Sequence, residues 1–437
     1  MTEPMPNAYV PGKGALAPAE AALVERRLRL LGPAYRLFYE TPVHLVRGEG
    51  VWLYDPEGNA YLDTYNNVAS VGHSHPHVVA AMARQAGTLA SHTRYLHETI
   101  LDYSERLLAT FPAPLEHVMF TCTGSEANDL ALRIARHRTG GTGVIVTENA
   151  YHGVTLAVST ISPSLGPGVP SADWVRVIPP PDPRRLGPDT GAAFADEVRR
   201  AIAELTAAGI RPAALIVDTI FSSDGVFAAP EGLLAPAAEA IRAAGGLFIA
   251  DEVQPGFGRT GTAMWGFQRH GVVPDMVSLG KPMGNGYPVA ALVLCPEVVA
   301  DFGARGRYFN TFGGNAVAAA VAAAVLDVIE TEGLQENALR TGARFAEALQ
   351  SLAARHDALG QIRGAGLFLG VDIVTEGAPD SALAARVVND LRAARVLISA
   401  TGPAAHVLKI RPPLVFDRDH ADLFCERLDT VLTVLGR

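Results

Sequence analysis

The chain has 437 residues, of which 49% are hydrophobic and 19% are charged, and its formal net charge is −9. This length and composition predict a globular protein with a sizeable core, built as two or three domains or as one large domain with a smaller one. The charge forms no long blocks of one sign, no apolar run reaches the roughly 18 residues of a membrane-spanning helix, and no secretion signal opens the chain, so we expect a cytoplasmic protein without nucleic-acid or membrane partners.

The first 75 residues combine a helical pattern at 18–32 with a β-hairpin at 51–55 and 60–63, around a turn at 56–59. Residues 76–325 then alternate between helical patterns and short apolar strands. The strands are apolar throughout, which is typical of buried parallel strands with helices on both faces. Helices are predicted at 76–88, 98–110, 128–138 and 315–330, and strands at 118–121, 143–146, 214–217, 247–250 and 276–279.

Residues 162–190 are rich in Pro, Gly and Ser and are predicted to leave the sheet as a long surface excursion. A helix at 336–356 and strands at 366–371 and 407–410 follow. The predicted fold class is therefore α/β. A large domain at 76–325 holds a mostly parallel sheet, and residues 1–75 and 326–437 form a smaller α+β domain.

Lysine is rare in this chain. Of its 36 cationic residues only Lys13, Lys281 and Lys409 are lysines, and the others are arginines. Because an amine can lose its proton whereas guanidinium stays charged, a surviving lysine marks a place where a neutral amine is useful. Genomic composition explains the same bias equally well, so the count alone assigns no role.

Two predicted strands are followed by charged-ligand candidates: one by a turn that could bind an anion, the other by a carboxylate that could bind a cation. Strand 118–121 is followed by Thr123, Gly124 and Ser125 and then by a helix, whose free N–H groups and positive dipole end favour a phosphate. A plain N-cap explains that turn as well. Strand 247–250 is followed by Asp251, a buried carboxylate that needs either a protonated ring nitrogen or an arginine such as Arg259.

A third strand, 276–279, is followed by Lys281. Ligands of open α/β sheets bind beyond the carboxyl ends of the strands, so the three strand ends are expected to meet there. A phosphate anchor, a carboxylate and an amine match what pyridoxal 5'-phosphate (PLP) requires, namely an anchor, a partner for the ring nitrogen and an amine for a Schiff base.

Over nearly its whole length the chain resembles class III of the aminotransferase superfamily, which are fold-type I PLP-dependent enzymes. The motifs that carry the resemblance are residues 123–128, 151–153, 248–254, 256–259, 280–282 and 310–315. The resemblance implies a homodimer, or a tetramer built from it, with the active site at the subunit interface and a small-molecule amine as substrate.

The resemblance also assigns residue roles. Lys281 forms the Schiff base and then acts as the general base, and Asp251 keeps the ring nitrogen protonated. Tyr151 stacks on the exposed face of the ring, Val253 packs behind it, and Gln254 contacts the ring hydroxyl. The phosphate is assigned to Thr123, Gly124 and Ser125, with Thr311 supplied by the partner subunit, while His152 is expected beside Tyr151.

Three positions depart from the usual family pattern. Lys409 stands where amino-acid aminotransferases of this class carry an arginine for the substrate carboxylate, Asp218 stands for a glutamate, and Phe221 for a glutamine. The last two changes are expected to alter the wall around the substrate. The segments around Asn66, Lys281 and Lys409 are similar to the ethanolamine-phosphate phospho-lyase branch of the family.

Lys409 and Arg411 together suit a phosphate, the first as a point charge and the second as a fork. Three hypotheses follow. An aminotransferase moving an amino group from an amine or ω-amino acid to a keto acid or aldehyde ranks first because that chemistry is commonest in the superfamily. A phospho-lyase, supported by Lys409 with Arg411 and by the region of Asn66 and Asn67, ranks narrowly second. A non-catalytic relative ranks last, because Lys281, Asp251 and Tyr151 are all present.

No metal site is expected. The three cysteines lie far apart without a Cys-x-x-Cys pair. His73, His75 and His77 have a spacing that suits a metal, but the family carries a similar turn without one, so a structural loop is predicted.

Overall fold

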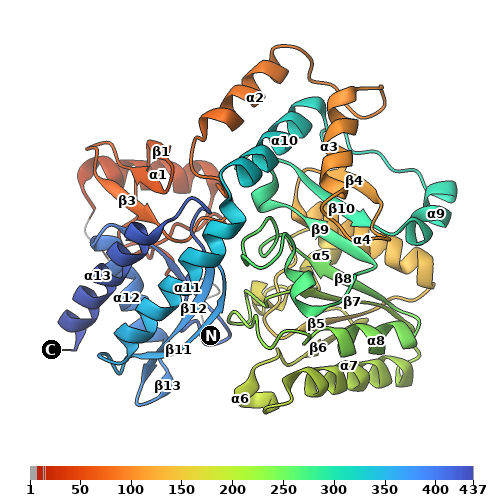
Figure 1. The fold of residues 1–437 in the computed structure, drawn as a ribbon. Helices are drawn as coiled ribbons and strands as arrows, with labels where there is room; N and C mark the ends of the chain where they lie inside the picture. Colours follow the sequence, from red (N-terminus) through yellow and green to blue (C-terminus); the bar gives the residue numbers. More distant parts are fainter. Residues whose placement is uncertain (1–6, 13, 15, 437) are drawn as a thin grey trace.

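A seven-stranded sheet in the order β4-β10-β9-β8-β7-β5-β6 forms the centre of the larger part of the molecule (Figure 1). The computed structural model describes residues 7–12, 14 and 16–436. The strands of this sheet are β4 (His117–Thr121), β5 (Gly143–Thr147), β6 (Val175–Ile178), β7 (Pro212–Asp218), β8 (Leu247–Asp251), β9 (Met276–Leu279) and β10 (Ala290–Leu294).

Helices cover both faces of this sheet. Along β7, Ala214 and Ile216 belong to one core cluster, which includes α4 (Gly124–Thr139), whereas Leu215 and Val217 belong to another. That second cluster includes α7 (Thr190–Ala207) and α8 (Ala235–Ala243). Both faces of the strand are buried, which explains why its sequence is apolar throughout. The predicted α/β class, with a mostly parallel sheet between two helical layers, is confirmed.

Strand β10 was not predicted from the sequence, and it breaks the parallel pattern. It pairs antiparallel with both β4 and β9. Since β4 and β9 both oppose β10, they run in the same direction as each other. The carboxyl end of β4 therefore lies at the same edge of the sheet as those of β7, β8 and β9.

The interpretation of residues 162–190 as a surface excursion is wrong in part. Residues Val175–Ile178 form β6, which pairs parallel with β5 at the edge of the sheet. Val175 and Ile178 are buried, so this segment contributes to the core despite its Pro- and Gly-rich surroundings. The short α6 (Pro183–Leu186) and the start of α7 lie in the same range.

Two smaller sheets form the second part of the molecule. One has the order β1-β2-β3-β14 and the other β11-β12-β16-β15, with β13 paired to β12. Their strands are β1 (Arg47–Glu49), β2 (Trp52–Tyr54), β3 (Ala60–Asp63), β11 (Leu359–Ala365), β12 (Phe368–Thr375), β13 (Ala378–Pro379), β14 (Val396–Leu397), β15 (Ser399–Thr401) and β16 (Val407–Ile410).

Segments from the two ends of the chain share the first of these small sheets. The hairpin of β2 and β3 was predicted and is confirmed, and β14 pairs parallel with β3 through Val396 and Leu62. In Figure 1 the red N-terminal elements accordingly lie beside the blue C-terminal ones. The domain limits at residues 75 and 325 stay predictions.

Six helices were predicted from the sequence, and five of them agree with the structure to within three residues at each end, whereas α4 begins at Gly124 and not at 128. Its start is stabilised by a capping box, in which Thr123 Oγ1 accepts the Glu126 N–H and Glu126 Oε2 accepts the Thr123 N–H. The remaining helices are α1 (Pro18–Leu31), α2 (Pro76–Ala86), α3 (Glu98–Leu108), α5 (Leu156–Ser159), α9 (Pro296–Arg305), α10 (Ala316–Thr331), α11 (Leu334–Ala353), α12 (Ser381–Ala393) and α13 (Arg418–Leu435).

Within the described part of the chain, no helix combines the length and apolar character needed to cross a membrane. The histidines of the 73–77 turn contact three different carboxylates: His73 contacts Asp63, His75 contacts Glu332 and His77 contacts Asp327.

Candidate active site

Three adjacent parallel strands deliver three predicted site residues to one edge of the central sheet. Asp218 at the end of β7 is in register with Asp251 at the end of β8, and Asp251 is in register with Ser278 of β9. Lys281 follows β9 by two residues. Because these strands are parallel, their carboxyl ends meet, as the sequence predicts.

A cavity of about 190 Å³ lies at this edge and brings together most of the predicted cofactor residues. It is lined by Thr123, Gly124, Ser125, Tyr151, His152, Gly153, Asp218, Asp251, Val253, Gln254 and Lys281. Thr311 does not line it. The side chain of Thr311 is exposed in this chain, so its assignment to the partner's site stays a prediction.

At the N-terminus of α4, the cavity is bounded by close backbone contacts that leave no room for additional side chains. A Cβ on Gly124 would lie 2.8 Å from Val253 Cγ2. A Cβ on Gly153 would lie 2.7 Å from Ser125 Cα, and Gly153 has a φ of +138°, which other residues rarely adopt. The Ser125 hydroxyl accepts the Val154 N–H at 3.1 Å. These residues keep the N-terminus of α4 open to a ligand, a geometry that fits a phosphate.

The Asp251 carboxylate is buried and held from two sides. Its Oδ2 accepts the Asn128 side-chain amide at 2.9 Å and lies 2.7 Å from His152 Nδ1. Its Oδ1 accepts the Val253 N–H at 3.1 Å. Arg259, the alternative partner expected from the sequence, does not pair with Asp251. Its guanidinium donates instead to the backbone carbonyls of residues 367 and 412. The interpretation of Asp251 as a structural partner of Arg259 is therefore wrong.

Asn128 was given no role from the sequence. It lies one helical turn after Gly124 on α4, so its side chain projects from the same face of the helix as the phosphate turn. Its amide also donates to the His152 carbonyl at 2.8 Å, which ties the loop after β5 to the end of β8. Its position four residues after Gly124, one helical turn away, was the sequence feature that could have predicted a role for Asn128 at this site.

Lys281 has the properties of a reactive amine. Burial lowers its pKa to about 8, and the nearby Arg411 guanidinium acts in the same direction, while Asp251 and Asp218 oppose both. Its Nζ lies 5.9 Å from the centre of the Tyr151 ring. A lysine with this pKa is partly neutral near neutral pH, so it can act as a nucleophile or a base.

A second cavity, of about 780 Å³, adjoins the first and shares Tyr151, Gln254 and Lys281 with it. Its cationic lining residues are Lys281, Lys409 and Arg411, and its lining includes no aspartate or glutamate. The polar residues Asn149, Ser223 and Thr401 also line it. The larger cavity is therefore suited to an anion.

Lys409 and Arg411 are buried, with exposed fractions of 6% and 7%. Arg411 donates to Asn67 Oδ1 at 2.8 Å and to Gln254 Oε1 at 2.5 Å, and it lies over the Tyr65 ring. Both of its hydrogen-bond acceptors are neutral. The Lys409 ammonium group forms no hydrogen bond or ion pair with any residue that the structure describes, and it lies 5.7 Å from the centre of the Phe368 ring. Burial lowers the pKa of Lys409 well below its ordinary value, and Arg411 lowers it further.

A chain of hydrogen bonds connects Asp218 to Arg411. Asp218 Oδ2 accepts the Ser222 hydroxyl, Ser222 Oγ accepts the Gln254 amide at 2.6 Å, and Gln254 accepts from Arg411. Burial raises the pKa of Asp218. In this chain Gln254 therefore contacts Ser222 and Arg411, and its expected contact with the cofactor hydroxyl stays a prediction. Ser222 was not singled out from the sequence.

Asn66 and Phe221 were both expected at the substrate wall, and neither side chain lies there. Asn66 Oδ1 accepts the Val68 N–H and lines neither cavity, whereas its neighbour Asn67 contacts Arg411. Phe221 does not form a substrate wall: it is 1% exposed and packs against Phe194 in the core beneath α7. A one-residue difference in a loop reverses which side chain points inward, and sequence spacing does not determine it.

The fold, the phosphate turn, the buried carboxylate and the amine define this protein as a PLP-dependent enzyme. The chain belongs to the class III aminotransferase family, whose model, described as "Aminotransferase class-III", matches residues 38–432.

Similar proteins have been named for two different reactions. A Drosophila melanogaster protein named alanine–glyoxylate aminotransferase 2-like is 42% identical over 418 residues, which are 92% of this chain and 85% of that protein. A Caenorhabditis elegans protein named ethanolamine-phosphate phospho-lyase homolog 1 is 37% identical over 439 residues, covering 95% of this chain and 94% of the relative. The structure of a phospholyase from Arthrobacter in complex with phosphoethanolamine has a TM-score of 0.91 and 43% identity, covering 94% of this chain and 99% of the other.

Proposed function

We propose that this enzyme is a PLP-dependent phospho-lyase that eliminates phosphate from phosphoethanolamine or a similar phosphorylated primary amine. The observation that carries the proposal is the pair of buried cations, Lys409 and Arg411, in a cavity beside Lys281 that no carboxylate lines. A buried charge without a partner is costly, so a ligand that supplies the opposite charge is strongly favoured at this position. A phosphate dianion supplies two negative charges, and a carboxylate supplies one.

The cofactor is proposed to occupy the smaller cavity. Gly124, Ser125 and the N-terminus of α4 would hold its phosphate, and Asp251 would face the ring nitrogen. Tyr151 and Val253 would cover the two faces of the ring, and Lys281 would hold the cofactor covalently. When bound, PLP supplies an electron sink that eases loss of a proton from the substrate carbon next to the amine. The pair of Asn128 and His152 orients the Asp251 carboxylate for this role.

In the proposed reaction, the substrate amine takes the place of Lys281 on the cofactor, and the freed Lys281 amine, whose lowered pKa leaves it partly neutral, would accept the proton from the substrate carbon next to the amine. Arg411 is held by Asn67 and Gln254 in a fixed orientation, which leaves it pre-organised to bind the phosphate. Lys409 supplies a second charge. The carbon–oxygen bond then breaks and phosphate leaves, so that phosphoethanolamine and water give acetaldehyde, ammonia and phosphate.

Aminotransferase activity is the second candidate, and it ranked first from the sequence. The name of the Drosophila melanogaster relative favours it, and the Arg411 guanidinium would also bind a carboxylate as a fork. We nevertheless rank the phospho-lyase first, because a substrate carboxylate carries only one negative charge for the two buried cations, Lys409 and Arg411.

The two reactions are separated by their products. Purified holoenzyme incubated with phosphoethanolamine alone should release phosphate and acetaldehyde in equal amounts, without any keto acid. Lys281→Ala is the control that removes catalysis. If neither product appears, but an amine donor and pyruvate yield alanine, the lyase proposal is wrong and the aminotransferase is favoured.

We also propose that the functional unit is a homodimer in which Thr311 of each chain completes the phosphate site of the other. Support comes from the exposure of Thr311 and of its neighbour Phe312, whose side chain is 69% exposed. A molar mass measured by light scattering would distinguish a dimer from a monomer. The cytoplasmic location stays a prediction.

A further inference from the structure

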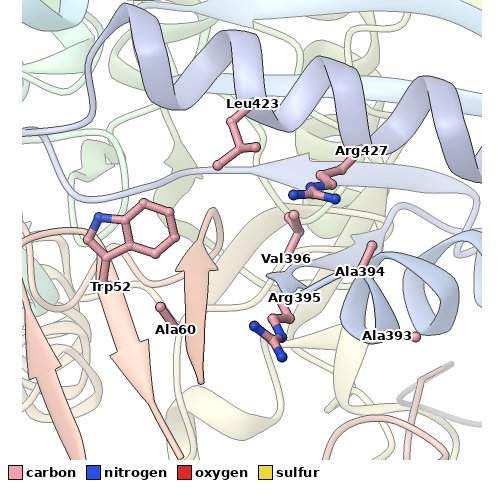
Figure 2. Close-up of a pocket in the computed structure, with 8 residues that line it drawn as sticks. All are labelled: Trp52, Ala60, Ala393, Ala394, Arg395, Val396, Leu423 and Arg427. Atoms are coloured by element: carbon pink, nitrogen blue, oxygen red, sulfur yellow. The ribbon is translucent and has the colours of Figure 1, made fainter. Parts of the chain in front are cut away.

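A separate cavity of about 310 Å³ lies in the part of the molecule that is built from the two ends of the chain (Figure 2). It is formed by β2, β3, the C-terminal end of α12, β14 and α13. None of the 8 lining residues that Figure 2 labels lines either cavity of the candidate active site. Any ligand of this cavity would therefore bind outside the site described above.

One part of the cavity wall is apolar. Ala60, Val396 and Leu423 contribute small or branched aliphatic surfaces, and Trp52 contributes an indole ring that Figure 2 places across from the arginines. The indole and the His420 ring meet in an edge-to-face arrangement, with ring centres 5.7 Å apart. Its N–H donates to none of the residues that the structure describes. An indole with a free N–H offers both a flat apolar surface and a hydrogen-bond donor.

The only ionisable lining residues are two arginines. Both are exposed. The Arg427 guanidinium forms no ion pair or hydrogen bond with any residue of the described chain, while the Arg395 guanidinium donates one hydrogen bond, to Asn59 Oδ1 at 2.7 Å. By contrast Arg418, on the same helix as Arg427, lies 3.5 Å from Asp422. The described wall of the cavity therefore carries two guanidinium groups and no carboxylate.

We infer that this cavity binds a small organic anion with a flat apolar body. Its carboxylate or phosphate would lie between Arg395 and Arg427, which match such groups as forks, and its body would lie against Trp52. The volume is at the lower end of the range of small-molecule sites, which begins at about 300 Å³. The inference is independent of the proposed lyase activity, because the two sites share no residue.

The test is a titration of the holoenzyme by calorimetry with benzoate, phenyl phosphate and, as the neutral counterpart, benzyl alcohol. We expect benzoate or phenyl phosphate to bind and benzyl alcohol not to bind. The more tightly bound of the two anions identifies the charged group that the site prefers. Arg427→Gln should weaken binding of that anion about tenfold, the effect of losing one charge-assisted hydrogen bond. Arg418→Gln makes the same change on the same helix and should leave binding unaltered.

Trp52→Phe should abolish the ligand-induced change in tryptophan fluorescence while leaving the affinity within about threefold, because a ring is kept. Arg395→Gln replaces Arg427→Gln if the latter does not fold. Equal affinity in the wild type and in the arginine variant would overturn the inference, as would failure of both anions to bind or equal binding of benzyl alcohol. Phosphate release from phosphoethanolamine by Arg427→Gln should match that of the wild type, so the two proposals fail separately.

Discussion

Replacing Lys409 by methionine should make the free enzyme more stable and less active. The lysine is 6% exposed and has no carboxylate within ion-pair distance among the residues that the structure describes. The more distant attraction of Asp218 and Asp224 does not outweigh the burial and the repulsion from Arg411, so the pKa of Lys409 is lowered. Methionine has a similar length and no charge. Removing a buried charge that has no direct ion-pair partner should stabilise the protein by on the order of 1–3 kcal/mol, which raises Tm by about 1–3 °C in a chain of this size.

The same substitution should lower kcat/KM for phosphoethanolamine by about 10- to 100-fold, the equivalent of one charged hydrogen bond of about 1.5–3 kcal/mol. Most of the loss should fall on KM, because the phosphate is present in both the bound substrate and the transition state. Lys409→Arg keeps a cation at this position. That variant should retain most of the activity and show no increase in Tm.

The stability gain should also depend on pH in a defined direction. The pKa of Lys409 is depressed in the folded protein, so the unfolded chain binds more protons between that value and the ordinary lysine pKa of about 10.4. Above that window the lysine is neutral in both states and carries no penalty, whereas below it the penalty is complete. The difference in Tm between Lys409→Met and the wild type should therefore be larger near pH 7 than near pH 10.

Scanning calorimetry of wild type, Lys409→Met and Lys409→Arg at the two pH values measures the first effect, and phosphate release measures the second. An unchanged Tm in Lys409→Met at both pH values would show that the lysine is compensated in the free enzyme. An unchanged kcat/KM would show that the substrate phosphate does not meet this side chain, and that part of the proposal would be withdrawn.

Three further outcomes are expected. First, the rate at which PLP binds covalently to the apo-enzyme can be measured from the visible absorbance of the cofactor. This rate should increase as the pH rises through about 8, the pKa of Lys281, because only the neutral amine attacks. A rate independent of pH would contradict this. Second, Gly153→Ala should weaken PLP binding and destabilise the protein by about 1–3 kcal/mol, because the new Cβ would lie 2.7 Å from Ser125 Cα. Gly168→Ala is the matched control, because a Cβ at Gly168 would meet open space. Equal Tm and PLP affinity in these two variants would refute the close approach. Asp251→Asn should reduce kcat by more than about a hundredfold with little change in Tm, and retained activity would remove the carboxylate from its role.

The strand ends could be predicted from the sequence because they depend on local patterns. Each of β4, β8 and β9 is a short apolar run followed directly by a polar group, and strand polarity then places Gly124, Asp251 and Lys281 at one edge. The strands β6 and β10 were missed. Strand β6 pairs with β5 across the Pro- and Gly-rich segment, and β10 lies between the preceding β9 and the distant β4, a position that only the folded sheet defines. Burial of Val175 and Ile178 outweighs the Pro- and Gly-rich composition around them.

By itself the sequence determined the family, the cofactor and the residues at the strand ends, since these follow from motifs in which neighbouring residues act together. The substrate side was decided only by the tertiary structure. Packing turned Asn67 inward in place of Asn66, placed Phe221 in the core, and brought Gln254 to Arg411 across 157 positions of the chain. Above all, burial left Lys409 without a carboxylate partner among the described residues, which no spacing in the sequence reveals. The physical reason is that desolvation and counter-charge depend on everything that surrounds a group, and those surroundings exist only in the folded chain.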